Sequence, residues 1–134
     1  MNSQKRFEVR FHPDAVKEYK KLDGSVLKMV NKSIDELELR ADETGKILRN
    51  NKSTKLAGCK EKKLKDAGIR IIFKITNERV DILRIVYVLS IEKRSDDFVF
   101  KIAHNRNNTL RKLPKDKFVD HIKRSENWAR YKKK

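Results

Sequence analysis

The sequence predicts an α+β fold: a compact single domain in the order β-α-α-β-β-β-α, with a basic helical extension at the C-terminus. Three observations predict it. Apolar and charged residues alternate near the N-terminus, two segments with helical spacing follow, and residues 60–91 are rich in β-branched residues between turn signals. We expect a three-stranded antiparallel meander with the helices packed on one face. The 134 residues suffice for one modest core.

The first strand is predicted over residues 5–12, where Phe7, Val9 and Phe11 alternate with charged residues. Pro13-Asp14 is typical of a helix start, and Asp23-Gly24 ends that short helix. Ser25 is the expected N-cap of a second helix. Its apolar positions recur at helical spacing: Val26, Met29, Val30, Ile34 and Leu37.

Residues 40–59 are predicted to be a connection, with one extra turn around Ile47-Leu48. A strand from about residue 60, a tight turn at Gly68 and a strand over residues 69–75 follow, and Asn77-Glu78 indicates the next turn. The nearly continuous apolar run from Val80 to Ile91 predicts a central strand buried on both faces. Ser95-Asp96-Asp97 then favours a helix start with Ser95 as N-cap.

Beyond this helix the sequence becomes polar and basic. Residues 104–109 are predicted to be a polar linker, and Pro114 is expected to start a last amphipathic helix. We therefore divide the chain into a domain over residues 1–106 and a basic extension over residues 107–134. Residues 104–134 hold eleven lysines and arginines and three acids. Their net charge of +8 is half of the net charge of +16 of the whole chain.

The composition narrows the classes of partner. A pI near 10.1 favours nucleic acid or another acidic partner. The single Cys59 cannot form an internal disulfide and is expected to be a packing residue. We see no apolar span of membrane length and no signal peptide, so a cytoplasmic location is expected. The three histidines, His12, His104 and His121, lack ligand spacing, so we expect no metal site and no cofactor.

Basic residues on the predicted sheet indicate a candidate catalytic site. Strand alternation separates Lys63, Arg70 and Arg94, as candidate site residues, from three lysines expected to be solvated edge charges: Lys60, Lys62 and Lys65. RNA carries its own nucleophile, the 2′-OH, so its cleavage needs positioning, a base, charge stabilisation at phosphorus and an acid. Arg70 and Arg94 suit the phosphate, and a lysine among like charges suits the base.

Several motifs stand in a fixed order along residues 5–106: Phe7-x-Val9-x-Phe11-His12-Pro13-x-Ala15, Tyr19-x-x-Leu22, Lys55-Leu56-x-Gly58, Lys63-Leu64, Gly68-x-Arg70-Ile71-Ile72-Phe73 and Glu92-Lys93-Arg94. This set resembles the RelE/ParE superfamily of type II toxin–antitoxin toxins. The lysine and arginine pattern is more similar to the RelE branch, which are ribosome-dependent mRNA endonucleases, than to the ParE branch, which acts on DNA gyrase.

The resemblance implies a metal-independent mRNA interferase that cuts in the ribosomal A site, with an acidic antitoxin as partner. It places Lys63, Arg70 and Arg94 in the catalytic set. Where such enzymes commonly carry a second lysine and a tyrosine, this chain has Glu61, an alternative base, and Phe100, which can stack on a base but cannot transfer a proton. The expected RNA-binding residues are Phe100, Lys74, Lys93 and His104, the last of which could also serve as the acid.

Glu61 and Phe100 also motivate a second hypothesis, a non-catalytic binder. Such a protein would be either a ParE-like gyrase inhibitor or a module that binds RNA or the ribosome. For the extension three roles remain open: it could cover the site, contact ribosomal RNA, or pack on the body.

Overall fold

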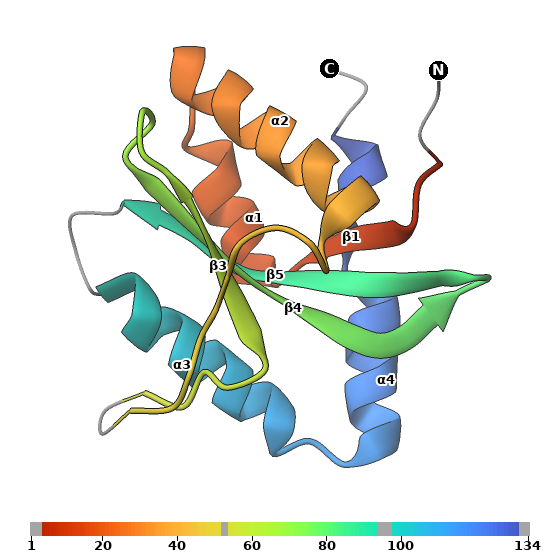
Figure 1. Cartoon of the computed structure of the whole chain (residues 1–134). Coiled ribbons are helices and arrows are strands. Elements are labelled where there is room, and N and C mark those ends of the chain that lie inside the picture. Colours follow the sequence, from red (N-terminus) through yellow and green to blue (C-terminus); the bar gives the residue numbers. More distant parts are fainter. Residues whose placement is uncertain (1–3, 52–53, 94–97, 132–134) are drawn as a thin grey trace.

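The computed structural model of the chain describes residues 4–51, 54–93 and 98–131. They form one six-stranded sheet in the order β2-β3-β4-β5-β1-β6, with β1 and β5 parallel and the other neighbours antiparallel (Figure 1). The strands are β1 (Phe7–Phe11), β2 (Lys46–Ile47), β3 (Cys59–Leu64), β4 (Ile69–Val80), β5 (Leu83–Lys93) and β6 (Glu126–Asn127). The helices are α1 (Pro13–Lys20), α2 (Gly24–Arg40), α3 (Phe98–Arg111), α4 (Lys115–Arg124) and the 3₁₀ helix η1 (Trp128–Arg130). The predicted α+β fold is confirmed.

Helices cover both faces of this sheet. In Figure 1, α1 and α2 lie on one face, here called the α2 face, and α3 and α4 lie on the other, the α3 face. The prediction that all helices pack on one face is wrong. The reason is β5, whose residues 85–91 are all buried, because an apolar strand in the middle of a sheet needs cover on both sides.

Strand alternation divides the side chains between two apolar cores. From β4, Ile71 and Phe73 join the core under α1 and α2, whereas Ile72 joins the core under α3 and α4. Cys59 is buried in this second core, where burial raises the pKa of its thiol to about 11. The expectation that Cys59 is a packing residue is therefore confirmed.

Two turns differ from the expectation. The chain reverses between β4 and β5 at Asp81, whose φ is 56°, whereas the predicted turn residues Asn77-Glu78 lie within β4. Aspartate tolerates this left-handed conformation better than most residues. The N-cap of α2 is Asp23, and Ser25 lies inside the helix, because Gly24 with a φ of 57° turns the chain directly into α2.

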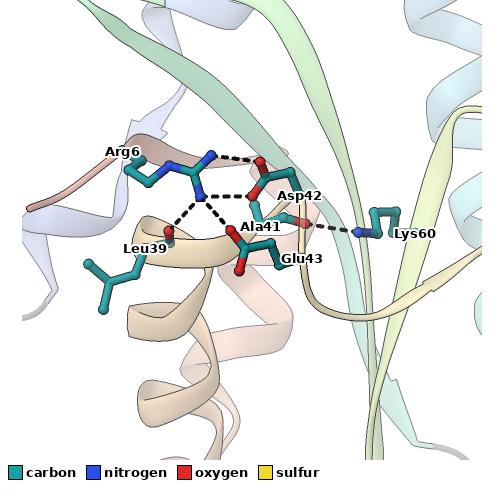
Figure 2. Close-up of polar contacts among 6 residues, drawn as sticks. All are labelled: Arg6, Leu39, Ala41, Asp42, Glu43 and Lys60. Carbon is teal, nitrogen blue, oxygen red and sulfur yellow. Dashed lines mark hydrogen bonds and ion pairs between the residues drawn. The ribbon is translucent and has the colours of Figure 1, made fainter. Parts of the chain in front are cut away.

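Two cations hold the C-terminal end of α2. Arg6 donates to the carbonyl of Leu39 at 3.1 Å and forms ion pairs with Asp42 and Glu43, as Figure 2 shows. Lys60 of β3 donates to the carbonyl of Ala41 at 3.0 Å (Figure 2). Positive groups are favourable here because the last carbonyls of a helix lack partners within it and the helix dipole is negative at this end.

The expectation of solvated edge charges is therefore wrong for two of the three lysines. Lys60 is half-buried against the end of α2, and Lys62 forms an ion pair with Glu36 of the same helix. Lys65 is exposed in the turn after β3, as expected. Because Lys60 and Lys62 point to the α2 face, Glu61 and Lys63 must point to the α3 face.

The C-terminal part of the chain continues the same folded body. Residues 104–109, predicted to be a linker, lie in α3, so the predicted boundary at residue 106 falls inside a helix. Helix α4 follows Pro114 as predicted. The two short strands β2 and β6, which pair with β3 and β1, were not predicted, because two residues carry no periodicity. No helix in the described part of the chain is long and apolar enough to span a membrane.

Candidate active site on the α3 face of the sheet

Lys63 and Arg70 lie directly opposite each other in the ladder between β3 and β4. The turn between them ends at Gly68, whose φ of 67° suits glycine. Both side chains belong to the α3 face. Lys63 is exposed, whereas the side chain of Arg70 is only 14% exposed. Two of the three predicted catalytic cations are therefore neighbours.

Glu61 lies on the same face and contacts Arg70. Its carboxylate oxygen Oε2 is 2.8 Å from Nε of Arg70, and its side chain is 3% exposed. A carboxylate this deeply buried needs a cation close by, and the guanidinium provides one. Glu61 thereby fixes the orientation of the guanidinium and offsets its charge.

Phe100 approaches Arg70 from α3. The Cζ atom of Arg70 is 4.7 Å from the centre of the Phe100 ring, which is a cation–π contact. The guanidinium is therefore held both by a carboxylate from β3 and by a ring from α3. We call Glu61, Lys63, Arg70 and Phe100 the Arg70 group.

The two other predicted cations, Lys93 and Arg94, follow one another in the sequence at the end of β5. Arg94 lies outside the described residues. Lys93 is opposite Ile69, a residue of the α2-face core, so the structure does not bring Lys93 to the Arg70 group. It borders a hollow of about 590 Å³ on that side, together with Lys21.

Sequence reasoning missed Glu92, which is the residue opposite Arg70 on β5. Lys63, Arg70 and Glu92 therefore form a row across three strands. Burial, followed by the neighbouring Glu18 carboxylate, raises the pKa of Glu92, while Arg106 acts in the opposite direction. The signal was present in the sequence, since Glu92 opens the Glu92-Lys93-Arg94 motif at the end of the central strand.

Beyond the end of β1, the ion pair of Glu18 and Arg106 bonds to the backbone of β5. Glu18 of α1 accepts from the backbone N–H of Ile91 at 2.9 Å, and Arg106 of α3 donates to the carbonyl of Leu89 at 2.7 Å. Arg106 and Glu18 are 2.6 Å apart. The pair thus satisfies backbone groups that have no strand partner and links helices on opposite faces.

The remaining RNA-binding candidates are His104 on α3 and Lys74 on β4. His104 is one turn beyond Phe100, and its Nδ1 accepts from the backbone N–H of Lys55 at 2.8 Å, so a neutral ring carries its proton on Nε2. Lys74 is half-buried below the helices and donates to Asn107 at 2.9 Å, and burial lowers its pKa. The structure therefore does not place Lys74 on an open surface beside Arg70.

Comparison with known proteins covers most of the chain. No protein-family model matches it. A curated Escherichia coli protein described as RelE-like toxin is 27% identical over 101 residues, which span 75% of this chain and 97% of that protein.

Solved structures agree with this comparison. The free E. coli toxin RelE with two arginines changed to alanine is 25% identical, with a TM-score of 0.59, and covers 77% of this chain and 98% of that one. The isolated E. coli RelE toxin is 27% identical, with a TM-score of 0.52, and covers 75% of this chain and 98% of that one. The toxin–antitoxin complex RelBE2 of Mycobacterium tuberculosis, at 24% identity, a TM-score of 0.53 and coverage of 72% and 100%, shares the fold. The chain is therefore similar, in sequence and in fold, to toxins of the RelE/ParE superfamily.

Proposed function

We propose that this RelE-like toxin is a cytoplasmic mRNA interferase of a type II toxin–antitoxin system, which cuts mRNA in the ribosomal A site. The observation that carries the proposal is the Arg70 group, in which an exposed lysine lies opposite a guanidinium whose orientation is fixed. Such a guanidinium is suited to binding a phosphate, because two N–H groups of the guanidinium can bind two phosphate oxygens at once.

The reaction needs only groups that RNA and this face supply. The 2′ oxygen attacks the adjacent phosphorus, the bond from phosphorus to the 5′ oxygen breaks, and the products are a 2′,3′-cyclic phosphate and a 5′-OH. Lys63, in its neutral form, takes the 2′ proton, and Arg70 stabilises the charge that develops on the phosphate oxygens. Arg94 is the proposed second phosphate ligand. His104 is the proposed donor of the proton to the leaving 5′ oxygen.

Glu61 has two roles open to it. It could take the 2′ proton in place of Lys63, or it could hold Arg70 in position. Its burial and its 2.8 Å contact with Nε of Arg70 support the positioning role. Lys63, being exposed on the same face, is better placed to meet a substrate.

Mapping of 5′ ends tests the proposal. The purified protein is incubated with programmed ribosomes and, separately, with naked mRNA. We expect cleavage on ribosomes. Arg70→Ala should slow this cleavage, because it removes ~2–4 kcal/mol of transition-state stabilisation. Lys65→Ala, which removes an exposed charge from the adjacent turn, is the matched control. If the intact protein cuts neither substrate, the proposal is wrong.

An acidic antitoxin is the proposed protein partner. The net charge of +16 favours an acidic ligand, and the RelE-type toxin of M. tuberculosis with this fold was solved in complex with its antitoxin. A short gene for an acidic protein beside this gene is the expected genomic arrangement, and its product should inhibit the toxin on co-expression.

One observation favours the alternative, a non-catalytic binder. The charge of Arg70 is already offset by Glu61, and the ring of Phe100 covers part of the guanidinium. Inhibition of DNA supercoiling with mRNA left intact would indicate a ParE-like gyrase inhibitor. Salt-dependent binding of RNA without cleavage would indicate a binding module.

A further inference from the structure

Four cations gather where α3 passes into α4. Within residues 111–117 the side chains of Arg111, Lys112, Lys115 and Lys117 are all exposed, and one acid, Asp116, accompanies them. We call these four residues the α3–α4 corner. A short connection joins the two helices here (Figure 1), and the four residues fall within seven consecutive positions of the chain. Helix α3 itself contains no acidic residue.

The four corner cations differ from the paired arginines on other helices. Elsewhere arginines pair with an acid four residues earlier, as Arg40 does with Glu36 and Arg124 with Asp120. Among the described residues, no ion pair within 4.0 Å is found for any of the four corner cations. Their mutual repulsion is therefore not offset by a close ion pair.

A buried lysine adds to the positive potential. The ammonium of Lys74 lies 5.8 Å from the centre of the Phe118 ring and donates to Asn107. Burial lowers the pKa of Lys74, and the nearby Arg111 lowers it further, so these two like charges repel each other. An arrangement that keeps like charges together at this cost to stability is suited to a polyanion.

The composition of the surface favours RNA over a protein as that polyanion. Protein interfaces usually bury an apolar or aromatic core within a polar rim. The large hydrophobic residues that are exposed in the described chain, Met29, Ile47 and Ile82, all lie outside residues 111–117. A surface whose exposed side chains are mostly cationic suits the regularly spaced phosphates of a nucleic acid.

The position of the corner relates it to the Arg70 group. Phe100 lies near the start of α3 and Arg111 at its end, and eleven residues of helix span about 16 Å. A stacked strand advances about 3.4 Å per nucleotide, so this distance corresponds to roughly five nucleotides. The face of α3 between them is polar, with Lys101, Asn105 and Thr109 exposed.

We propose that the α3–α4 corner binds the phosphate backbone of RNA about five nucleotides from the Arg70 group. The choice of RNA rests on the proposed function. The corner, at residues 111–117, lies beyond residue 106, the predicted end of the RelE-like part of the chain. It would give this toxin an RNA contact of its own in addition to the sheet.

Fluorescence anisotropy tests the proposal with single-stranded RNAs whose 2′-O-methyl groups prevent cleavage. One RNA has about twelve nucleotides and can reach from the Arg70 group to the corner, and the other has about four and cannot. The variant is the triple change Lys112→Gln, Lys115→Gln and Lys117→Gln. The matched control removes three exposed lysines from α1 and α2: Lys20→Gln, Lys28→Gln and Lys32→Gln.

We expect the corner variant to bind the longer RNA roughly hundredfold more weakly at 0.1 M salt. The slope of log affinity against log salt concentration should also be smaller in magnitude by about 2, because each phosphate contact on a single strand contributes about 0.7 to that slope. The affinity of the corner variant for the shorter RNA should equal that of the unchanged protein. The control variant should lose much less affinity for the longer RNA than the corner variant does. Equal losses in the corner variant and the control, or no loss in the corner variant, would overturn the proposal.

Polyglutamate distinguishes an acidic protein from RNA as the partner of the corner. If polyglutamate binds the intact corner as tightly as the longer RNA does, the partner is an acidic protein and the RNA assignment is wrong. Because binding is measured without cleavage, a failure of the cleavage test leaves this result unaffected. Conversely, loss of the corner contact would leave cleavage that depends on Arg70 in place.

Discussion

Arg70, the proposed phosphate ligand, is held by two contacts. Its Nε contacts the carboxylate of Glu61 at 2.8 Å, and its Cζ lies 4.7 Å from the centre of the Phe100 ring. These contacts restrict the guanidinium before any substrate binds, which reduces the entropy cost of positioning a phosphate. Glu61 and Phe100 therefore act together on one arginine.

Glu61→Gln separates the positioning role of Glu61 from the role of a base. A positioning residue should lower the cleavage rate, by roughly a hundredfold if Arg70 moves by about 1 Å, without changing the shape of the pH–rate profile. Single-turnover cleavage measured against pH checks this. A profile that loses its acidic limb would instead identify Glu61 as the base. Asp66→Asn, an exposed change in the adjacent turn, should leave the rate unaltered.

At the scale of elements, the C-terminal segment is part of the core. Strand β6 pairs with β1, and Trp128 and Tyr131 pack against Phe11 and Tyr19. The indole of Trp128 also donates to Asp35 of α2 at 2.8 Å. Of the three roles considered for the extension, packing on the body therefore describes this segment, and a truncation after Asn108 would remove core residues.

Trp128→Ala should destabilise the protein by ~3–5 kcal/mol, because it leaves a cavity in the aromatic cluster and removes the bond to Asp35. The residue is only 1% exposed. Urea unfolding followed by circular dichroism measures the change. Arg130→Ala, two residues away and paired with Glu126 at the surface, should cost less than about 1 kcal/mol. Equal effects of the two variants would argue against a core role for the segment.

Helix α4 is joined to the body by a cluster of His12, Tyr87 and His121. The hydroxyl of Tyr87 is 2.7 Å from Nε2 of His121, and the centres of the two histidine rings are 6.4 Å apart. Burial, followed by Arg106, lowers the pKa of His12 to about 4, although Asp14 and Glu18 act against this shift. Burial also lowers the pKa of His121.

This cluster makes stability depend on pH. A histidine whose pKa is lowered by folding stabilises the folded state fully above its unfolded value of about 6.5, and this contribution is lost as the pH falls toward 4. For His12 the loss is on the order of 2 kcal/mol once solvent screening of a half-buried ring is included. Urea unfolding at a series of pH values between these limits measures it.

His12→Asn is the matched variant for this measurement. Asparagine can still accept from the backbone N–H of Asp14, as Nδ1 of His12 does at 3.0 Å, but it does not titrate. Its stability should therefore fall less than that of the unchanged protein over the same pH range. Parallel pH curves for the two proteins would contradict the assignment.

For the whole molecule, the cations fall into two groups. Some neutralise helix ends and carboxylates, as Arg6, Lys60 and Lys62 do at α2. On the α3 side several remain exposed, including Lys63 and the α3–α4 corner. The net charge of +16 therefore divides into cations that hold the fold together and cations that can meet an anionic partner.

The two faces are connected through the pair of Glu18 and Arg106 at the edge of β5. Arg106→Ala should cost ~3–5 kcal/mol, because it leaves the carboxylate of Glu18 and the carbonyl of Leu89 without this donor in a buried place. Denaturant unfolding measures the loss. Arg124→Ala, which breaks the exposed pair with Asp120, should change stability by less than about 1 kcal/mol. A loss of similar size in both variants would refute this role for Arg106.

The sequence by itself determined the features that depend on neighbours along the chain. Alternation along one strand assigned Glu61 and Lys63 to the face opposite Lys60 and Lys62. The turn predicted at Gly68 then placed Arg70 on the next strand, and the structure shows it opposite Lys63. A hairpin with a tight turn fixes its register locally, so these residues could be placed without knowledge of the rest of the fold.

Only the tertiary structure decided which distant groups meet Arg70 and how the C-terminal segment packs. The ring of Phe100 over Arg70, the row from Lys63 to Glu92 and the insertion of Trp128 beside Phe11 each depend on how a helix or strand packs from far along the chain. Periodicity shows that a residue is buried, but not which partner buries it. The partner is chosen when both faces of the central strand are covered, and that choice involves the whole molecule.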